Sequence, residues 1–181
     1  MTGKFVIEPL DTRRHDRMTF SSGVDAVDNF LQKTAGKLMK GGTARVFVAV
    51  DPADTCGRIL GFYAINAHSI EYQALPGRYR RYALPDGNIP AAFIGMIGVT
   101  EAVQGNGLGG LLLADALKGA QFASERVGTA VVLLDILDCG NPDAVTRRQR
   151  LYESYGFQSL PSCPLRMFLP VTTIARAYND R

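Results

Sequence analysis

"VTEAVQGNGLGGLLLADAL", residues Val99–Leu117, joins a short glycine-rich loop to a run of helix-forming residues. Gly105, Gly107 and Gly110 match the spacing G-x-G-x-x-G, which is typical of dinucleotide-binding loops. Read from Gln104, the same stretch also matches Q-x-x-G-x-G. Both patterns place a phosphate group at the start of a helix, where unpaired N–H groups and the helix dipole attract anions. The remainder of the chain must decide between them.

Length and composition predict a single globular domain spanning residues 1–181. Of the 181 residues, 46% are hydrophobic and 20% are charged, which is usual for a soluble protein. No apolar run approaches the roughly 20 residues that cross a bilayer, and the N-terminal residues lack a signal-peptide pattern. We therefore expect a cytoplasmic protein without membrane contact.

The metal-binding and redox residues are few and scattered. Cys56, Cys139 and Cys163 lie far apart and form no C-x-x-C pair, and His15 and His68 stand alone. This inventory predicts neither a disulfide framework nor a metal site. The formal net charge of +3 permits an anionic partner without requiring one.

Hydrophobic patterning predicts strands alternating with helices. Strands are expected at residues 5–10, 43–51, 58–70, 91–99, 130–137 and 165–171, and helices at 24–38, from the glycine-rich loop to about 126, and at 146–155. Residues 71–90 are expected to be irregular. This order predicts an α/β fold with a mixed, mostly antiparallel central sheet and helices on both faces.

The element order weighs against a dinucleotide. In dinucleotide-binding folds the glycines directly follow the first strand of a repeated βαβ unit. Here "TEAVQ" separates the strand ending at Val99 from the first glycine, and only residues 111–181 remain. Asp135 ends the next strand, where a ribose-binding acid is expected, so the dinucleotide remains the alternative.

A second motif makes the pattern more specific. In "RRQRLYESYGF", residues 147–157, Tyr152 lies on the last predicted helix. Taken together, "GMIGVT" (95–100), "QGNGLGG" (104–110) and "LYESYGF" (151–157) resemble the GNAT superfamily of acetyl-CoA-dependent N-acetyltransferases. Residues 20–51, 59–70 and 164–170 are further similar to the acetyltransferase toxins of bacterial toxin–antitoxin pairs. The resemblance extends from about Ile7 to Ile174.

The resemblance implies acetyl-CoA as the cosubstrate. Its acetyl and pantetheine arm would lie along the central strand, and its pyrophosphate on the glycine-rich loop. The residues so implied in binding are Ile97, Gly98, Val99, Gln104, Gly105, Asn106, Gly107, Leu108, Gly109, Gly110 and Asn141. Tyr152 matches the tyrosine that protonates the departing thiolate. Family members often have an asparagine about seven residues before that tyrosine, whereas Asn141 lies eleven before it, so this loop departs from the family pattern.

The chemistry bears on which amine is acetylated. An amine attacks a thioester only when neutral; at pH 7 an α-amine of pKa ~8 is about one-tenth neutral, against about one in two thousand for lysine. Glu101 and Asp135 are the nearest candidate bases by chain position, and neither is an evident one. A tyrosine of pKa ~10 would protonate the thiolate more readily if its pKa were lowered. A site without a strong base favours an α-amine, because a larger fraction of it is already neutral. This agrees with the aminoacyl-tRNA substrates that the toxin resemblance implies.

Two basic clusters predict contact with RNA. "GRYRRY", residues 77–82, places arginines among tyrosines, a combination that meets phosphates and stacks on bases. "TRRQR", residues 146–150, lies beside Tyr152. The candidate RNA-binding residues are Arg78, Arg80, Arg81, Arg147, Arg148 and Arg150. Lys33, Lys37 and Lys40 of the first helix are candidates to extend this surface.

The sequence leaves several points open. The leading hypothesis is a translation-blocking toxin whose partner is a cognate antitoxin. The alternatives are a GNAT enzyme acting on a small-molecule amine or a protein N-terminus, and a non-catalytic module that binds acetyl-CoA or RNA. The oligomeric state is undecided, although dimers are common in the family.

Overall fold

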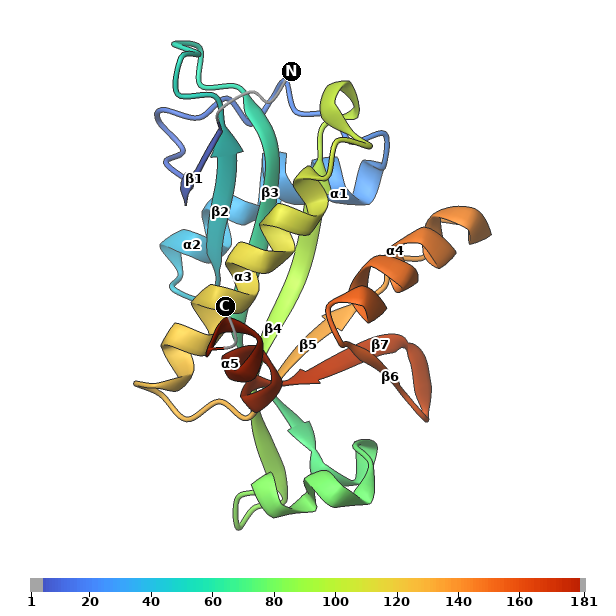
Figure 1. The fold of residues 1–181 in the computed structure, drawn as a ribbon. Helices are drawn as coiled ribbons and strands as arrows, with labels where there is room; N and C mark the ends of the chain where they lie inside the picture. Colours follow the sequence, from blue (N-terminus) through green and yellow to red (C-terminus); the bar gives the residue numbers. More distant parts are fainter. Residues whose placement is uncertain (1–4, 180–181) are drawn as a thin grey trace. The chain divides into compact units, whose positions relative to one another are not determined.

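The computed structural model of the chain describes residues 5–179 (Figure 1). Its elements, in chain order, are β1 (Val6–Pro9), α1 (Asp25–Asn29), the π-helical turn η1 (Phe30–Thr34), α2 (Ala35–Lys40), β2 (Arg45–Val50), β3 (Ile59–Glu71), the 3₁₀ turns η2 (Tyr72–Ala74) and η3 (Gly77–Tyr82), β4 (Asn88–Val99), the 3₁₀ turn η4 (Glu101–Val103), α3 (Leu108–Ser124), β5 (Val131–Asp135), α4 (Pro142–Ser154), β6 (Gln158–Leu160), β7 (Cys163–Pro170) and α5 (Val171–Asn179).

The strands are hydrogen-bonded in the order β1-β2-β3-β4-β5-β7-β6. β4 pairs with β5 in parallel, whereas β1 with β2, β2 with β3, β5 with β7 and β6 with β7 are antiparallel. The prediction of a mixed, mostly antiparallel sheet is therefore confirmed. The chain forms two compact units, one of Met1–Asn66 with Gly95–Ala116 and one of Ala67–Ile94 with Leu117–Arg181.

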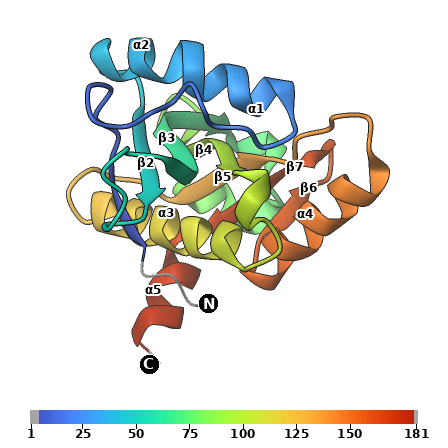
Figure 2. The same cartoon turned by 90° about the horizontal axis from the view of Figure 1, so that it is seen from above.

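In the first unit, helices cover both faces of the strands, as predicted (Figure 2). A Cβ atom added to Gly98 would lie 2.5 Å from Cγ1 of Val27 in α1, so α1 lies directly against this face. On the other face, a Cβ atom added to Gly61 would lie 2.8 Å from Cδ1 of Leu112 in α3. Glycine at both positions allows the helices to approach the strands closely.

The predicted first helix is present, but it is divided into three pieces. Val27, Leu31 and Ala35, which follow one another at helical spacing, are buried. The middle piece, η1, is a π-helical turn rather than α-helix, a change that the apolar spacing did not predict. The helix ends before the glycine pair at 41–42, with Gly41 as the C-cap of α2.

In the second unit, β5 and β7 form the centre of the core. Val131, Leu133 and Phe168 belong to a buried cluster that also includes Tyr79 from η3. The segment expected to be irregular therefore folds into two short 3₁₀ turns that cover this core. The strand β6 and the helix α5 are also additional to the predicted elements.

No helix within residues 5–179 is both long enough and apolar enough to span a membrane.

Candidate functional site

The glycine-rich loop connects β4 to α3 and is open to an incoming ligand. Gly105 and Gly107 have φ angles of +80° and +82°, in the region that favours glycine. No atom lies within 4 Å of a Cβ atom added at either position. These two glycines are therefore required by the backbone conformation of the loop and not by packing around it.

The loop presents unpaired N–H groups at the start of a 17-residue helix. The N–H groups of Gly110 and Leu111 donate to the carbonyl oxygen of Gly107, at 3.1 and 3.2 Å. Among residues 5–179, no hydrogen bond uses the N–H groups of residues 106–109. With the positive end of the helix dipole, these donors form a cradle that suits a pyrophosphate.

Gln104 supports the loop from behind. Its Nε2 donates to the carbonyl oxygens of Val99 and Ser22, both at 2.9 Å. Next to it, the N–H of Glu101 and the hydroxyl of Thr100 donate to the carbonyl of Ser21, at 2.9 and 3.0 Å. The turn before α1 thus holds the loop in place. Sequence reasoning missed this role of residues 21–22, because they belong to no motif.

The end of β4 carries the three strand residues predicted to bind the cosubstrate. Ile97 and Val99 are half-buried, and Gly98 is buried. The identity of Gly98 is explained by packing, since a Cβ atom there would lie 2.5 Å from Val27 and 2.7 Å from Phe62. The carbonyl of Val99 already accepts the Gln104 amide. Binding through the backbone of these residues stays a prediction.

Tyr152 lies on the buried side of α4, with 8% of its surface exposed. Its ring lies beside that of Phe157, with centroids 6.2 Å apart. Burial raises the pKa of Tyr152 above its ordinary value, and the nearby positive charge of Arg148 opposes this only in part. The lowered pKa that would ease proton donation is therefore not what this environment produces.

Asn141 is the N-cap of α4. Its Oδ1 accepts the N–H of Ala144 at 3.1 Å, and Pro142 follows at the first helical position. Asn followed by Pro is a usual way to begin a helix, so the sequence contained this signal. The side chain therefore has a structural role in the loop that departs from the family pattern, and contact with the cosubstrate remains a prediction.

The arginines of the first basic cluster are exposed, but one of its tyrosines is not. Arg78, Arg80 and Arg81 are exposed, and their guanidinium groups lie 4.7–5.0 Å from the ring centroids of neighbouring tyrosines. Tyr79 is buried and packs edge-on against Phe168 at 5.2 Å. Its ring is part of the core and is not available to stack on a base.

The second basic cluster contains both exposed and half-buried arginines. Arg147 and Arg150 are exposed, whereas Arg148 is half-buried. The guanidinium of Arg148 donates to the carbonyl of Leu137 at 2.8 Å and lies 3.6 Å from Sγ of Cys139. Arg148 therefore holds the loop before α4, which is a structural role that its neighbours do not share.

Neither carboxylate considered as a base is free. Asp135 forms a two-point ion pair with Arg166, at 2.6 and 2.7 Å. Glu101 accepts the Ser21 hydroxyl at 3.2 Å. Both contacts occupy carboxylate oxygens, so these two residues offer no evident strong base.

The chain matches the acetyltransferase (GNAT) domain family over residues 42–159. This range includes the cradle and Tyr152. The chain belongs to the GNAT acetyltransferases. Membership selects the Q-x-x-G-x-G pattern of the loop, and the dinucleotide alternative is set aside.

Similarity to individual toxins extends over most of the chain. The chain is 51% identical to the probable toxin TacT of Sinorhizobium fredii, over 94% of this chain and 93% of that protein. It is 32% identical to the tRNA-acetylating toxin of Mycobacterium tuberculosis, over 85% of each. A solved structure of a tyrosine-to-phenylalanine mutant of the toxin AtaT, bound to acetyl-CoA and to the C-terminus of the antitoxin AtaR, has the same fold. It is 21% identical, with 96% of this chain and 98% of that chain covered and a TM-score of 0.78.

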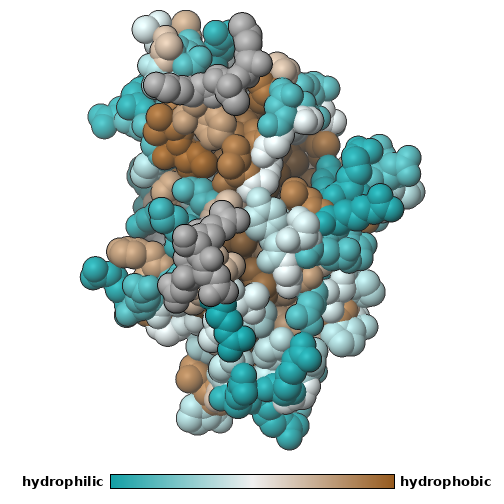
Figure 3. All heavy atoms as spheres, viewed as in Figure 1, coloured by the Kyte–Doolittle hydropathy of each residue, from teal (hydrophilic) through white to brown (hydrophobic). Residues whose placement is uncertain are grey.

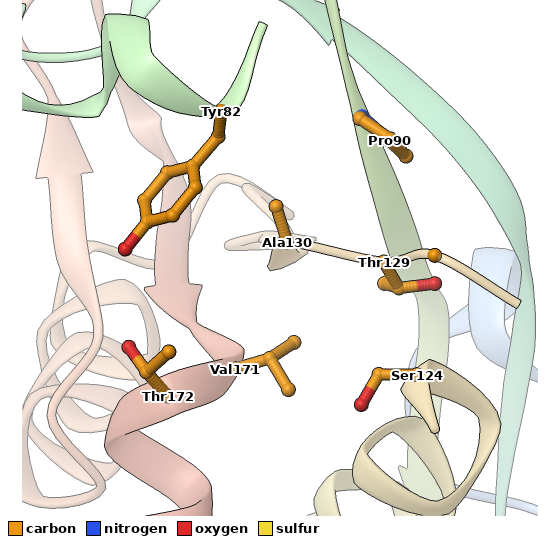
Figure 4. A pocket seen from close by; sticks show the side chains of 8 residues that line it. Tyr82, Pro90, Ser124, Thr129, Ala130, Val171 and Thr172 are labelled. Atoms are coloured by element: carbon orange, nitrogen blue, oxygen red, sulfur yellow. The ribbon is translucent and has the colours of Figure 1, made fainter. Parts of the chain in front are cut away.

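A cavity of about 390 Å³ in the second unit of this GNAT protein contains no predicted site residue (Figure 4). Pro90, Ala130 and Val171 give it an apolar wall. The hydroxyls of Ser124 and Thr129 at its edge donate to nearby carbonyls. This cavity shows no arrangement for catalysis. Within residues 5–179, no group of three or more His, Cys, Asp or Glu side chains is placed to hold a metal ion.

Proposed function

We propose that this GNAT protein transfers the acetyl group of acetyl-CoA to the α-amine of aminoacyl-tRNA and so stops translation. The observation that carries the proposal is its likeness, along most of its length, to a probable toxin and to a tRNA-acetylating toxin. The open cradle and the buried tyrosine supply what such a reaction needs. The proposal includes that residues 1–181 form a single GNAT domain.

The cradle is assigned to the pyrophosphate of acetyl-CoA. The N–H groups of residues 106–109 are free to donate to phosphate oxygens, and the two left-handed glycines leave room for close approach. Gln104 acts on the ligand through the backbone, because its own amide is used by Val99 and Ser22. Ile97, Gly98, Val99 and Asn141 stay in the proposal as contacts to the rest of the cosubstrate.

Tyr152 is assigned as the general acid. Acetyl-CoA supplies a thioester whose C–S bond breaks as the amine forms the new N–C bond. The Tyr152 hydroxyl then gives its proton to the departing sulfur, and the proton that the attacking nitrogen loses returns the Tyr152 phenolate to its hydroxyl form. The raised pKa keeps this hydroxyl protonated at neutral pH. It makes the proton harder to release, but apolar surroundings also raise the proton affinity of a thiolate.

The absence of a free carboxylate at Asp135 and Glu101 fits an amine that is already partly neutral. An α-amine of pKa ~8 meets this condition far better than a lysine of ~10.4. Electron withdrawal by the ester bond of an aminoacyl-tRNA lowers the amine pKa further. The substrate class therefore agrees with the chemistry that the side chains support.

RNA contact is assigned to the exposed arginines of the two basic clusters, namely Arg78, Arg80, Arg81, Arg147 and Arg150. The surface over α4 is largely hydrophilic, as Figure 3 shows. Arg148 is omitted because the loop before α4 uses its guanidinium. We also propose that the protein is cytoplasmic, because charged tRNA is found there. A cognate antitoxin as partner and a homodimeric state are further parts of the proposal.

The direct test is to incubate the purified protein with [¹⁴C]acetyl-CoA and each charged tRNA in turn. We expect label on the aminoacyl group of at least one tRNA, released with the amino acid by mild base. Uncharged tRNA is the matched control and should remain unlabelled. Transfer to small amines or to peptide N-termini without transfer to any charged tRNA would support the ordinary GNAT alternative and contradict the proposal.

A further inference from the structure

Arg148 is the member of the second basic cluster that faces inward. It is half-buried, whereas the nearby Arg147 and Arg150 are exposed. Its spacing of four residues from the buried Tyr152 places both side chains on one face of α4, one turn apart. Ala144, one turn earlier, is buried on the same face. The guanidinium therefore lies on the side of the helix that carries the proposed general acid.

The guanidinium of Arg148 holds the chain where it leaves β5. Its Nη1 donates to the carbonyl oxygen of Leu137 at 2.8 Å, a short distance that is typical of a charged donor. The preceding residue, Ile136, donates its N–H to the carbonyl oxygen of Leu165 in β7 at 2.7 Å. The backbone at residues 136–137 is thus attached to the sheet on one side and to α4 on the other.

The start of α4 also has supports of its own, but these are local. Oδ1 of Asp138 accepts the N–H of Gly140 at 3.0 Å, and Oδ1 of Asn141 accepts the N–H of Ala144 at 3.1 Å. Both bonds lie within residues 138–144. The bond from Arg148 spans eleven residues and closes the loop onto the end of the strand, so it relates the helix to the core.

The same guanidinium also acts on Tyr152 through its charge. Burial raises the pKa of the Tyr152 hydroxyl, and the positive charge of Arg148 lowers it in part. A cation has this effect only when it is near the phenol, because it stabilises the phenolate. Arg148 is therefore close to the proposed proton donor as well as to the loop.

We infer that Arg148 is a positioning residue for the general acid, because it fixes α4 against the end of β5 and so holds the Tyr152 hydroxyl in place for proton transfer to the departing sulfur. The inference rests on the proposed function, which assigns Tyr152 as that acid. An RNA phosphate would compete with the Leu137 carbonyl for the same donor. The positioning role therefore replaces the RNA contact that the sequence predicts for Arg148.

The test is a double-mutant cycle between Arg148→Met and Tyr152→Phe. Methionine keeps an apolar stem but has neither the charge nor the N–H donors. Arg45→Met is the matched control, because Arg45 is exposed and its guanidinium also donates to a backbone carbonyl, that of Ala44, at 3.3 Å. The kcat, the KM for charged tRNA and the acetyl-CoA affinity of each variant are measured below its melting temperature.

We expect Arg148→Met to lower kcat about 10- to 100-fold, because a small misplacement of a catalytic group has an effect of this size. The KM for charged tRNA and the acetyl-CoA affinity should stay within about twofold of wild type, and Arg45→Met should keep all three values. In the Tyr152→Phe protein, the Arg148 change should lower kcat less than about twofold, since the hydroxyl is already absent. Arg148→Lys keeps the charge and a donor, so its kcat should lie between those of Arg148→Met and wild type.

An equal loss of kcat with and without the Tyr152 hydroxyl would overturn the inference, because Arg148 would then act independently of Tyr152. A raised KM for charged tRNA with an unchanged kcat would also overturn it and would make Arg148 an RNA contact. If Arg148→Met does not fold, Arg148→Gln takes its place in the cycle, with the same two criteria.

The two proposals fail in different ways. If another amine is acetylated and charged tRNA is not, the proposed function is wrong. The cycle is then run with that amine, because every acceptor releases the same thiolate. If charged tRNA is acetylated but Arg148 and Tyr152 contribute independently to kcat, the inference is wrong and the proposed function stands.

Discussion

The side-chain amide of Gln104 lies 2.9 Å from the carbonyl oxygen of Val99, across the start of the glycine-rich loop. The same amide reaches Ser22 at the same distance. One side chain therefore joins the end of the central strand, the turn before the first helix and the loop that leads into α3. We interpret Gln104 as a positioning residue for the cradle.

Replacing Gln104 by Met keeps the size of the side chain but removes both hydrogen bonds. Each contributes about 0.5–1.5 kcal/mol, so the ordered loop should be weakened and the KM for acetyl-CoA should rise about tenfold or more. The rate at saturating acetyl-CoA should change less. Steady-state kinetics check this, with Gln149→Met as the control, because the Gln149 amide donates to Glu153 on the same helix, α4, and not to the loop. An unchanged KM would remove Gln104 from the positioning role.

Gly107→Ala should weaken acetyl-CoA binding through backbone strain. A φ of +82° costs a residue with a Cβ atom about 1–2 kcal/mol, so calorimetric titration should show an affinity loss of about 5- to 30-fold. Gly119→Ala is the matched control, because Gly119 is an exposed position of α3 with free space around it. That change should raise the free energy of unfolding by about 0.5–1 kcal/mol and leave affinity unchanged. Equal effects on affinity at the two sites would contradict the assignment of the loop.

Tyr152→Phe should lower kcat about 10²- to 10⁴-fold, the usual range for a general acid. Acetyl-CoA affinity should stay within about twofold, because only the hydroxyl is removed. Tyr63→Phe tests the same change elsewhere: the Tyr63 hydroxyl donates to Asp115 at 2.7 Å in the core. That variant should lose about 1–3 kcal/mol of unfolding free energy and keep its kcat. A fully active Tyr152→Phe protein would exclude the general-acid role.

The raised pKa of Tyr152 determines the alkaline side of the pH profile. The protonated hydroxyl is the active form, and raising its pKa keeps that form present to higher pH. We expect kcat/KM to rise through the amine pKa of ~8 and to stay level to at least pH ~10. An amide-linked aminoacyl-RNA analogue is needed, because the natural ester hydrolyses in base. A decline that begins below pH 9 and disappears in Tyr152→Phe would show that the pKa is lowered instead.

The sequence predicted those elements whose pattern is long or strongly punctuated. The apolar run that forms β4 predicted the central strand, and the glycines before α3 predicted the start of the helix that follows it. The hydrophobic pattern did not predict β6, because its three residues, Gln158–Leu160, are too few to show an alternation. It also missed α5, whose first residues, "VTT", favour strand and directly follow β7.

At the site, the sequence identified residue types better than their surroundings. Tyr79 lies between arginines in the sequence, yet it is the buried residue of η3 and packs in the core. Arg148 looks equivalent to Arg147, but the direction of each side chain on α4 decides which one contacts the loop. The hydrogen bonds from Arg17 to the π-helical turn join residues 14 and 15 positions apart, so no local sequence pattern predicts them.

Cell-free translation with purified protein tests the central claim most directly, with and without acetyl-CoA and with Tyr152→Phe in parallel. We predict that wild-type protein stops translation only when acetyl-CoA is present and that the variant does not. Acetylated aminoacyl-tRNA should accumulate as synthesis stops. Translation that continues at the normal rate with wild-type protein, acetyl-CoA and a full set of charged tRNAs would contradict the account.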